Sequence, residues 1–234
     1  VVVVTASDGT NTTTQEITVN LTNVSDVAPV FTSANAFSVA EGTDAVATLT
    51  GSDADGDSLS FSTTLAGADA ADFALTAGGV LTFAATPNFE VPADADANNV
   101  YSITATITDG TFTTSQDITV TVTDINDNSP VLSASTPYTV AEGTTTVGTV
   151  SATDADASST ITYTLSGTDA ADFTLSSSGA LAFATTPDFE APADADTDNS
   201  YSLSVTASDG SNTDTEAIVV NVTNTNDESP VFTS

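Results

Sequence analysis

The sequence predicts an all-β protein made of tandem Greek-key β-sandwiches, each with seven strands, from three observations. Apolar residues alternate with Thr or Ser through much of the chain. Turn residues such as Asp-Gly separate these alternating runs, and no long run has a helical period. The same short segments recur about 100 residues apart. About seven short strands in roughly 100 residues are typical of an antiparallel sandwich.

The repeat sets the domain organisation. AEGT occurs at 40–43 and 141–144, and DAD at 53–55 and 154–156. An Asp-Gly aspartate and a linker proline each occur three times, at Asp8, Asp109 and Asp209 and at Pro29, Pro130 and Pro230. We therefore predict a C-terminal remnant of a module at 1–29, full modules at 30–130 and 131–230, and the start of another module at 231–234.

Strands are expected where the period is two. Residues 101–107 and 118–122 each place apolar side chains on one face and Thr or Ser on the other. Gly78-Gly79 and Asp109-Gly110 predict tight turns, and 69–72 predicts a single helical turn. Residues 1–22 resemble a hairpin that needs further sequence or a neighbouring subunit to cover its faces. The expected core aromatics are Phe37, Phe61, Phe73, Phe83, Phe89 and Tyr101, then Tyr138, Tyr163, Phe173, Phe183, Phe189 and Tyr201.

The charge is extreme, because 32 Asp and Glu residues stand against no Lys, Arg or His, giving −32. Two carboxylates about 4 Å apart repel by roughly 4 kcal/mol at an effective dielectric near 20, so clustered carboxylates need cations. Ca²⁺ is the natural candidate for oxygen ligands. Nucleic acid and anionic membrane surfaces are excluded as partners, since both are bound through Lys and Arg. No disulfide is possible without Cys, and no apolar run is long enough for direct membrane insertion.

Acidic residues gather at the module ends. The clearest group is DINDNSP at 124–130, which follows an expected strand and precedes the next module. Together with the AEGT glutamate, the (D/N)xE at 88–90 and 188–190, the DxD and the Asp-Gly aspartate, this pattern resembles the cadherin-like repeats of large bacterial cell-surface adhesins. The resemblance covers the whole chain. It implies Ig-like sandwiches joined by calcium-binding linkers, with up to three Ca²⁺ at each junction.

The resemblance also implies which residues ligate the metal. At the middle junction they are Glu41, Asn88, Glu90, Asp124, Asn126, Asp127, Asn128, Asp154, Asp156 and Asp209, with Asn128 using its backbone carbonyl. At the next junction they are Glu142, Asp188, Glu190, Asn224, Asn226 and Asp227. At the first junction they are Asn23, Asp26, Asp53, Asp55 and Asp109. Asn88 at the middle junction and Asn224 at the next stand where the family usually has Asp. At the first junction Asn23, Ser25 and Val27 depart from the linker pattern, so fewer ions are expected there.

A purely structural role for these residues competes with calcium binding, because Asp and Asn are common in turns. Glu in two strands is not explained by turn chemistry, and this favours calcium. PADAD at 92–96 and PADADTD at 192–198 either hold an extra ion or stay hydrated, and a run of like charges favours hydration. Asp57 is expected only to extend its turn.

The functions expected from the sequence are mechanical. The first is a calcium-stiffened stalk or spacer of an extracellular adhesin at the cell surface, whose partners are the neighbouring modules of the same chain. The alternative is a subunit of an extracellular filament or sheath in which identical chains complement one another's strands. We expect no enzyme, no catalytic residue and no organic cofactor, because the carboxylates belong to metal patterns.

Overall fold

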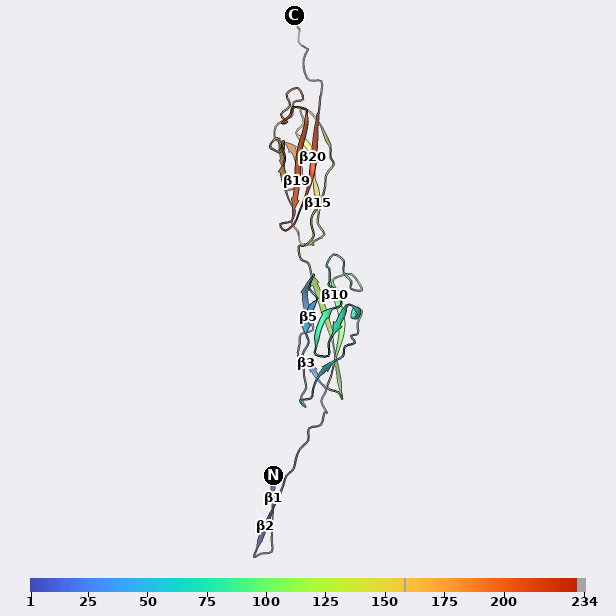
Figure 1. Cartoon of the computed structure of the whole chain (residues 1–234), viewed down its shortest axis with the longest axis vertical. Coiled ribbons are helices and arrows are strands. Elements are labelled where there is room, and N and C mark those ends of the chain that lie inside the picture. Colours follow the sequence, from blue (N-terminus) through green and yellow to red (C-terminus); the bar gives the residue numbers. More distant parts are fainter. Residues whose placement is uncertain (158, 231–234) are drawn as a thin grey trace. The chain divides into compact units, whose positions relative to one another are not determined.

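The computed structural model describes residues 1–157 and 159–230, so the predicted module start at 231–234 lies outside the described residues. The chain divides into two compact units, Val1–Thr123 and Asp124–Ser234. Figure 1 shows the strands of each unit along the chain. Within the described residues no helix is long and apolar enough to cross a bilayer.

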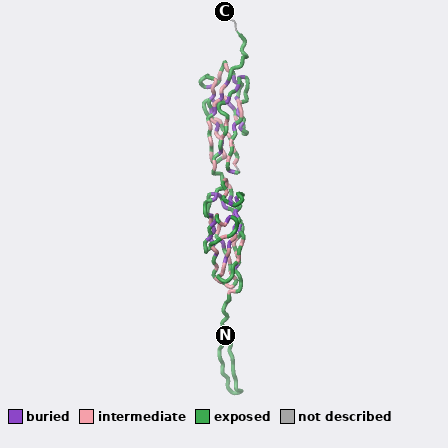
Figure 2. The backbone as a smooth tube through the Cα atoms, turned by 90° about the vertical axis from the view of Figure 1, so that its right-hand side faces the viewer, coloured by how far each residue is buried: buried purple, intermediate pink, exposed green. Residues whose placement is uncertain are grey.

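The first unit begins with a two-stranded antiparallel hairpin of β1 (Val2–Ser7) and β2 (Thr12–Ile17). One carboxylate oxygen of Asp8 accepts the backbone N–H groups of Thr10 and Asn11 at 2.8 and 2.7 Å, which closes the turn. Every residue of the hairpin is exposed, as the tube in Figure 2 shows. The hairpin therefore has no apolar core of its own.

The sandwich of the first unit follows the hairpin. Its first two strands are each interrupted, as β3 and β4 and as β5 and β6, because the chain moves from one sheet to another. The strands are β3 (Val30–Phe31), β4 (Ala36–Ala40), β5 (Ala45–Thr48), β6 (Gly51–Ser52), β7 (Ser60–Phe61), β8 (Phe73–Leu75), β9 (Val80–Phe83), β10 (Val100–Thr108) and β11 (Thr113–Thr123). The predicted single helical turn is present as the 3₁₀ turn η1 (Ala70–Asp72).

Two sheets form the layers of this sandwich. One has the order β4-β11-β10-β7 and the other β5-β9-β8, while β3 pairs with β6. One pair of this unit departs from the antiparallel pattern, because β4 runs parallel to β11 from Ala36 beside Thr119 to Ala40 beside Thr123. Alternation of apolar residues predicts a strand but not the direction of its partner. As a result, β4 and β11 end side by side.

The second unit repeats this architecture. Its sheets have the orders β13-β20-β19-β16 and β14-β18-β17, with β12 paired to β15 and β13 parallel to β20. The strands are β12 (Val131–Ser133), β13 (Tyr138–Ala141), β14 (Thr146–Thr149), β15 (Ser151–Thr153), β16 (Thr162–Ser166), β17 (Phe173–Leu175), β18 (Ala180–Phe183), β19 (Ser200–Ser208) and β20 (Thr213–Thr223), with η2 (Ala170–Asp172). The all-β, Greek-key sandwich prediction is confirmed.

The core of each unit comes from the alternating strands. Ile103, Ala105 and Ile107 on β10 and Ile118, Val120 and Val122 on β11 are all buried in one core, and Ile103 lies opposite Ile118. Of the twelve expected core aromatics, Phe37, Phe89, Tyr163 and Phe189 are only partly buried against the cores and the other eight are buried. Phe73, Phe83 and Tyr101 pack together with ring centroids 4.5 to 5.6 Å apart and the tyrosine edge-to-face with both phenylalanines, and Phe173, Phe183 and Tyr201 repeat this arrangement.

The turn before β9 requires glycine at position 79. Gly79 before β9 has φ of +88°, and a Cβ there would lie 2.3 Å from the carbonyl oxygen of Leu49. Only glycine fits a left-handed position that lies so close to backbone. The Gly78-Gly79 pair therefore fixes the turn that the sequence predicts.

Candidate metal sites

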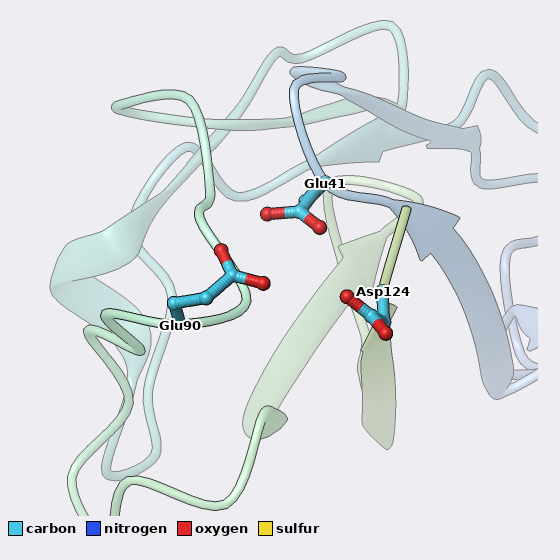
Figure 3. A group of neighbouring side chains, drawn as sticks. All are labelled: Glu41, Glu90 and Asp124. Carbon is cyan, nitrogen blue, oxygen red and sulfur yellow. The ribbon is translucent and has the colours of Figure 1, made fainter. Parts of the chain in front are cut away.

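The parallel pairing of β4 and β11 assembles the first acidic group. Glu41 directly follows β4 and Asp124 directly follows β11, so both lie where these two strands end, at one edge of the unit. Glu90 comes from the loop between β9 and β10. Figure 3 shows the three carboxylates pointing toward one another, and each has an oxygen within 4.8 Å of the others. The place of Asp124 follows from its peptide bond to Thr123.

The same edge of the second unit carries a matching group. Glu142 follows β13, and Asp188 and Glu190 come from the loop between β18 and β19, with carboxylate oxygens within 4.8 Å of one another. Asn224 follows β20 and donates its side-chain amide to Glu190. The backbone N–H groups of Phe189 and Thr225 donate to the two carboxylate oxygens of Glu142 at 2.7 and 2.6 Å. This group brings together the predicted ligands Glu142, Asp188, Glu190 and Asn224.

The electrostatics of this edge separate its two glutamates. Hydrogen bonds from the backbone of Thr225 and Phe189 hold the pKa of Glu142 below its usual value. Desolvation raises the pKa of Glu190, and the nearby charge of Glu142 adds to this. Glu142 is therefore held in its ionised form, and a cation beside Glu190 would offset the cost of charging it.

The opposite edge of the second unit gathers another set. Asp154 and Asp156 after β15 and Asp209 in the β19–β20 turn have carboxylate oxygens within 4.8 Å of one another. Backbone N–H groups of Ser211 and Asn212, each at 2.6 Å from one oxygen of Asp209, hold the pKa of that carboxyl below its usual value. These bonds keep Asp209 ionised beside two other carboxylates.

The linker residues that precede β12 contact this set. The backbone N–H of Asn128 donates to Asp156 at 3.1 Å, and its side-chain amide donates to the other oxygen of Asp156 at 2.8 Å. With its amide oriented to satisfy its neighbours, Asn126 donates to Asp209 and Asp156 at 3.0 and 3.2 Å. The carbonyl of Asn128, which the resemblance assigns to the metal, accepts the side-chain amide of Asn212 at 2.8 Å. A second lone pair of this carbonyl is left for an ion.

The matching edge of the first unit differs in one residue. Its group contains Asp53, Asp55 and Asp57, with oxygens within 4.8 Å of one another. One oxygen of Asp55 accepts the backbone N–H groups of Asp26 and Val27 at 3.0 and 2.9 Å, and the Asn23 amide donates to the Asp55 carbonyl. Here Asp57 contributes a carboxylate that the sequence reading treated only as part of a turn.

Several carboxylate oxygens at these edges are shut off from solvent and accept no hydrogen bond. They belong to Asp53, Asp57 and Asp109 in the first unit and to Asp154 in the second. In Asp53, Asp109 and Asp154 the other oxygen accepts turn N–H groups, so each carboxylate is held by one oxygen and leaves one without a donor. A buried ionised oxygen without a partner is costly, so these atoms fit a divalent cation.

Other predicted ligands have weaker claims on geometry. The side-chain oxygen of Asn88 accepts the backbone N–H of Val91 at 2.7 Å, so this residue shapes its loop and adds no charge. Asp26 contributes its backbone N–H to Asp55, and the backbone N–H of Asp227 donates to the carbonyl of Thr225. Asn226 is an exposed linker residue. Asp127 is exposed as well, but one of its carboxylate oxygens lies within 4.8 Å of one of Asp156. Their role as ligands stays a prediction.

The acidic loops at 92–96 and 192–198 are not hydrated throughout. Asp94 and Asp194 are only 5% and 3% exposed, and their carboxylates accept backbone N–H groups of their own loops. Burial opposes the ionisation of Asp94, but hydrogen bonds from Asn98, Asp96 and Asn99 outweigh it and hold its pKa below the usual value. The expectation of solvated charge is therefore wrong for these two aspartates, and the sequence gives no signal that separates them from their exposed neighbours Asp96 and Asp196.

Comparisons with known proteins agree with this architecture. Residues 25–123 match a protein family described as Bacterial Ig domain. Over 110 residues the chain is 41% identical to human Protocadherin Fat 1; the match takes in 44% of the chain and spans 2% of that relative's length.

Solved structures with the same fold are cadherins. Drosophila N-cadherin EC1-4 matches with a TM-score of 0.67 and 24% identity over 85% of this chain and 50% of that one. Human Protocadherin-24 EC1-2 gives 0.70 and 19% over 85% and 99%, and human CDH23 EC21-23 gives 0.68 and 22% over 89% and 73%. The resemblance to cadherin repeats is confirmed at the level of fold.

Proposed function

We propose, from the premise that this chain consists of cadherin-like repeats, that it is a calcium-stiffened stalk or spacer of an extracellular cell-surface adhesin. One observation carries the proposal. At the module edges, carboxylate oxygens lie within 4.8 Å of one another, and some are buried without a donor, in a chain that has no Lys, Arg or His. A cation must come from outside the chain, and oxygen-rich sites of this kind suit Ca²⁺.

Binding energy becomes stiffness if the ions bind residues of two successive modules together. Extracellular calcium modules bind with dissociation constants of about 10⁻⁴ to 10⁻³ M. At ten times that constant each site contributes roughly 1.4 kcal/mol, so three ions at a junction contribute about 4 kcal/mol. This is enough to favour one arrangement of two modules over many, because a tenfold preference needs only about 1.4 kcal/mol.

Small-angle X-ray scattering with saturating Ca²⁺ and with chelator tests the proposal. We expect the maximum dimension to be sharply defined in calcium and broadly distributed in chelator. NaCl at matched ionic strength is the control, since screening of the −32 charge acts without sites. An unchanged distribution of dimensions on removing calcium would contradict the stalk.

A second candidate is assembly between chains by strand complementation, which the β1–β2 hairpin favours. Val2, Val4 and Ile17 are 56%, 48% and 43% exposed, although the equivalent positions on β10 and β11 are buried. Strands of another copy would cover this face. Sedimentation velocity should then show assembly that grows with concentration and is lost in a Val2→Asp, Val4→Asp double variant. A monomer at every concentration would exclude this candidate.

A further inference from the structure

Hydrogen bonds connect the acidic loop of each unit to the glutamates at the nearby edge of the same unit. In the first unit Asp69 is 4% exposed, and its two oxygens accept the backbone N–H groups of Ala95 and Ser102 at 2.8 and 2.6 Å. Asp94 in turn accepts the backbone N–H groups of Asn98 and Asn99 at 2.8 and 3.2 Å. Two buried carboxylates therefore hold the loop against η1 and β10.

Asn99 connects this loop to the segment that carries Glu90. It has φ of +63° and is 8% exposed. Its side-chain amide donates to the carbonyl of Phe89 at 2.8 Å, and its carbonyl accepts the backbone N–H of Val122 on β11 at 2.9 Å. The backbone N–H of Phe89 donates to Glu41 at 2.7 Å. Asn99 thus links the acidic loop and β11, through its backbone, to Phe89, through its side chain, and Phe89 precedes Glu90 and donates to Glu41.

The second unit repeats every link. Asp169 accepts from Ala195 and Ser202 at 3.0 and 2.6 Å, and Asp194 accepts from Asp198 and Asn199 at 2.8 and 3.4 Å. Asn199 has φ of +66° and donates to the carbonyl of Phe189 at 3.0 Å, and Phe189 donates to Glu142 at 2.7 Å. Asp198 stands at the position of Asn98. The hydrogen bond that it donates to Asp194 uses its backbone N–H, as that of Asn98 to Asp94 does, so the change of side chain leaves this bond in place.

We propose that Asn99 and Asn199 are positioning residues, through which the buried acidic loops hold the Glu90 and Glu190 segments and the carboxylates of Glu41 and Glu142 in place. The inference rests on the proposed function for its effect on calcium, while the hold on the segment stands on the contacts themselves. It gives the acidic loops a role that neither an extra ion nor hydration supplies. Groups that orient ligands from behind typically change metal affinity by about 10- to 100-fold when they are removed.

The substitution Asn99→Gly in the full chain removes the side-chain amide and keeps a residue that accepts positive φ. Ala97→Gly is the matched control, because Ala97 lies in the same loop at φ of +56° and is exposed. Amide hydrogen exchange in chelator is the first measurement. We expect the Phe89 and Glu90 amides of Asn99→Gly to exchange about tenfold or more faster than in Ala97→Gly. Equal exchange in the two variants would overturn the inference.

Calcium titration followed by ¹⁵N NMR is the second measurement, read at the Glu90 amide and, as internal reference, at the Asp55 amide. In Asn99→Gly the dissociation constant at Glu90 should rise about tenfold relative to Ala97→Gly, and that at Asp55 should stay within about twofold. Equal constants at Glu90 would overturn the effect on the ion. If wild type shows no calcium response at Glu90, the proposed function fails, and the exchange comparison still decides whether Asn99 holds the segment.

Discussion

At the scale of single residues, the chain uses carboxylates for two different tasks. Asp69 and Asp94 are buried acceptors of backbone N–H groups, whereas Asp53, Asp109 and Asp154 each give one oxygen to a turn and leave the other without a donor. Hydrogen bonds to backbone satisfy the first kind, and the second kind needs a cation. Substitutions should therefore separate stability from metal binding.

Glu41→Gln tests the metal-binding task. Gln keeps an oxygen that can accept the backbone N–H of Phe89 but removes a charge, so we expect the fold to persist and calcium affinity at this edge to fall about tenfold. Isothermal titration calorimetry measures the change. Asp44→Asn, on an exposed residue close in sequence, is the control and should leave affinity within about twofold. Equal effects of the two substitutions would mean that Glu41 acts only through overall charge.

Asp94→Asn tests the structural task through pH. The pKa of Asp94 is lower in the fold than in the unfolded chain, so its ionised form stabilises the fold above about pH 4 and loses this effect as pH falls through the folded pKa. Near neutral pH in chelator, the substitution should lower the free energy of unfolding by about 1 to 3 kcal/mol. Urea unfolding at pH 7 and pH 3 should show the difference shrinking at pH 3. A difference independent of pH would contradict a role of the charge.

Sequence reasoning at this scale found the residues that recur in a pattern and missed those whose role depends on burial. The resemblance to cadherin-like repeats grouped Asp154, Asp156 and Asp209, and the fold brings their carboxylate oxygens within 4.8 Å of one another. Asp94 stood in a run of aspartates that looked solvated, and its burial depends on the backbone N–H groups of a folded loop. Nothing in the sequence marks Asn99, because its side-chain amide gains a role only when the fold places it beside the carbonyl of Phe89.

At the scale of strands, the period of two predicted β10 and β11, because each buries one face. It could not predict that β4 runs parallel to β11, since a strand's own alternation is the same for either direction of its partner. Nor could it show where β3 passes to β4, because strands this short carry little pattern. The pairing of β4 with β11 is nonetheless what brings Glu41 to its place.

The repeat offers a matched test of strand burial. Val120 on β11 is 0% exposed, and Val19, its equivalent after β2, is 66% exposed. Val120→Ala should lower the free energy of unfolding by about 2 to 3 kcal/mol, because it removes buried methyl groups and leaves a cavity. Val19→Ala should change it by less than about 0.5 kcal/mol. Urea unfolding followed by far-UV circular dichroism compares the two, and a comparable loss in both would show that the hairpin is covered in solution.

At the scale of the whole molecule, the charge of −32 and the grouped carboxylates predict a stability that depends on calcium. Each occupied site should add about 1.4 kcal/mol at ten times its dissociation constant. A gain of this size raises the Tm of a small domain by about 4 to 8 °C per kcal/mol. Differential scanning calorimetry with Ca²⁺ and with chelator measures the rise.

The control for this prediction is NaCl at the ionic strength of the calcium buffer. Screening weakens repulsion between all carboxylates, whereas site binding requires oxygens at the right separation. We expect NaCl to produce less than half of the rise that Ca²⁺ produces. Equal rises would mean that calcium acts on the chain only as a screening ion.

The parallel pairing of β4 with β11, and of β13 with β20, also decides how each module responds to tension. Each pair joins a strand near the start of its module to the strand at its end, in registers that run from Ala36 beside Thr119 to Ala40 beside Thr123 and from Tyr138 beside Val220 to Ala141 beside Thr223. Force applied at the two ends of a module drags these strands past one another lengthwise. The hydrogen bonds between them are then loaded in shear and must rupture together, so a module pulled along the chain resists extension where a hairpin opened from its tip would unzip bond by bond.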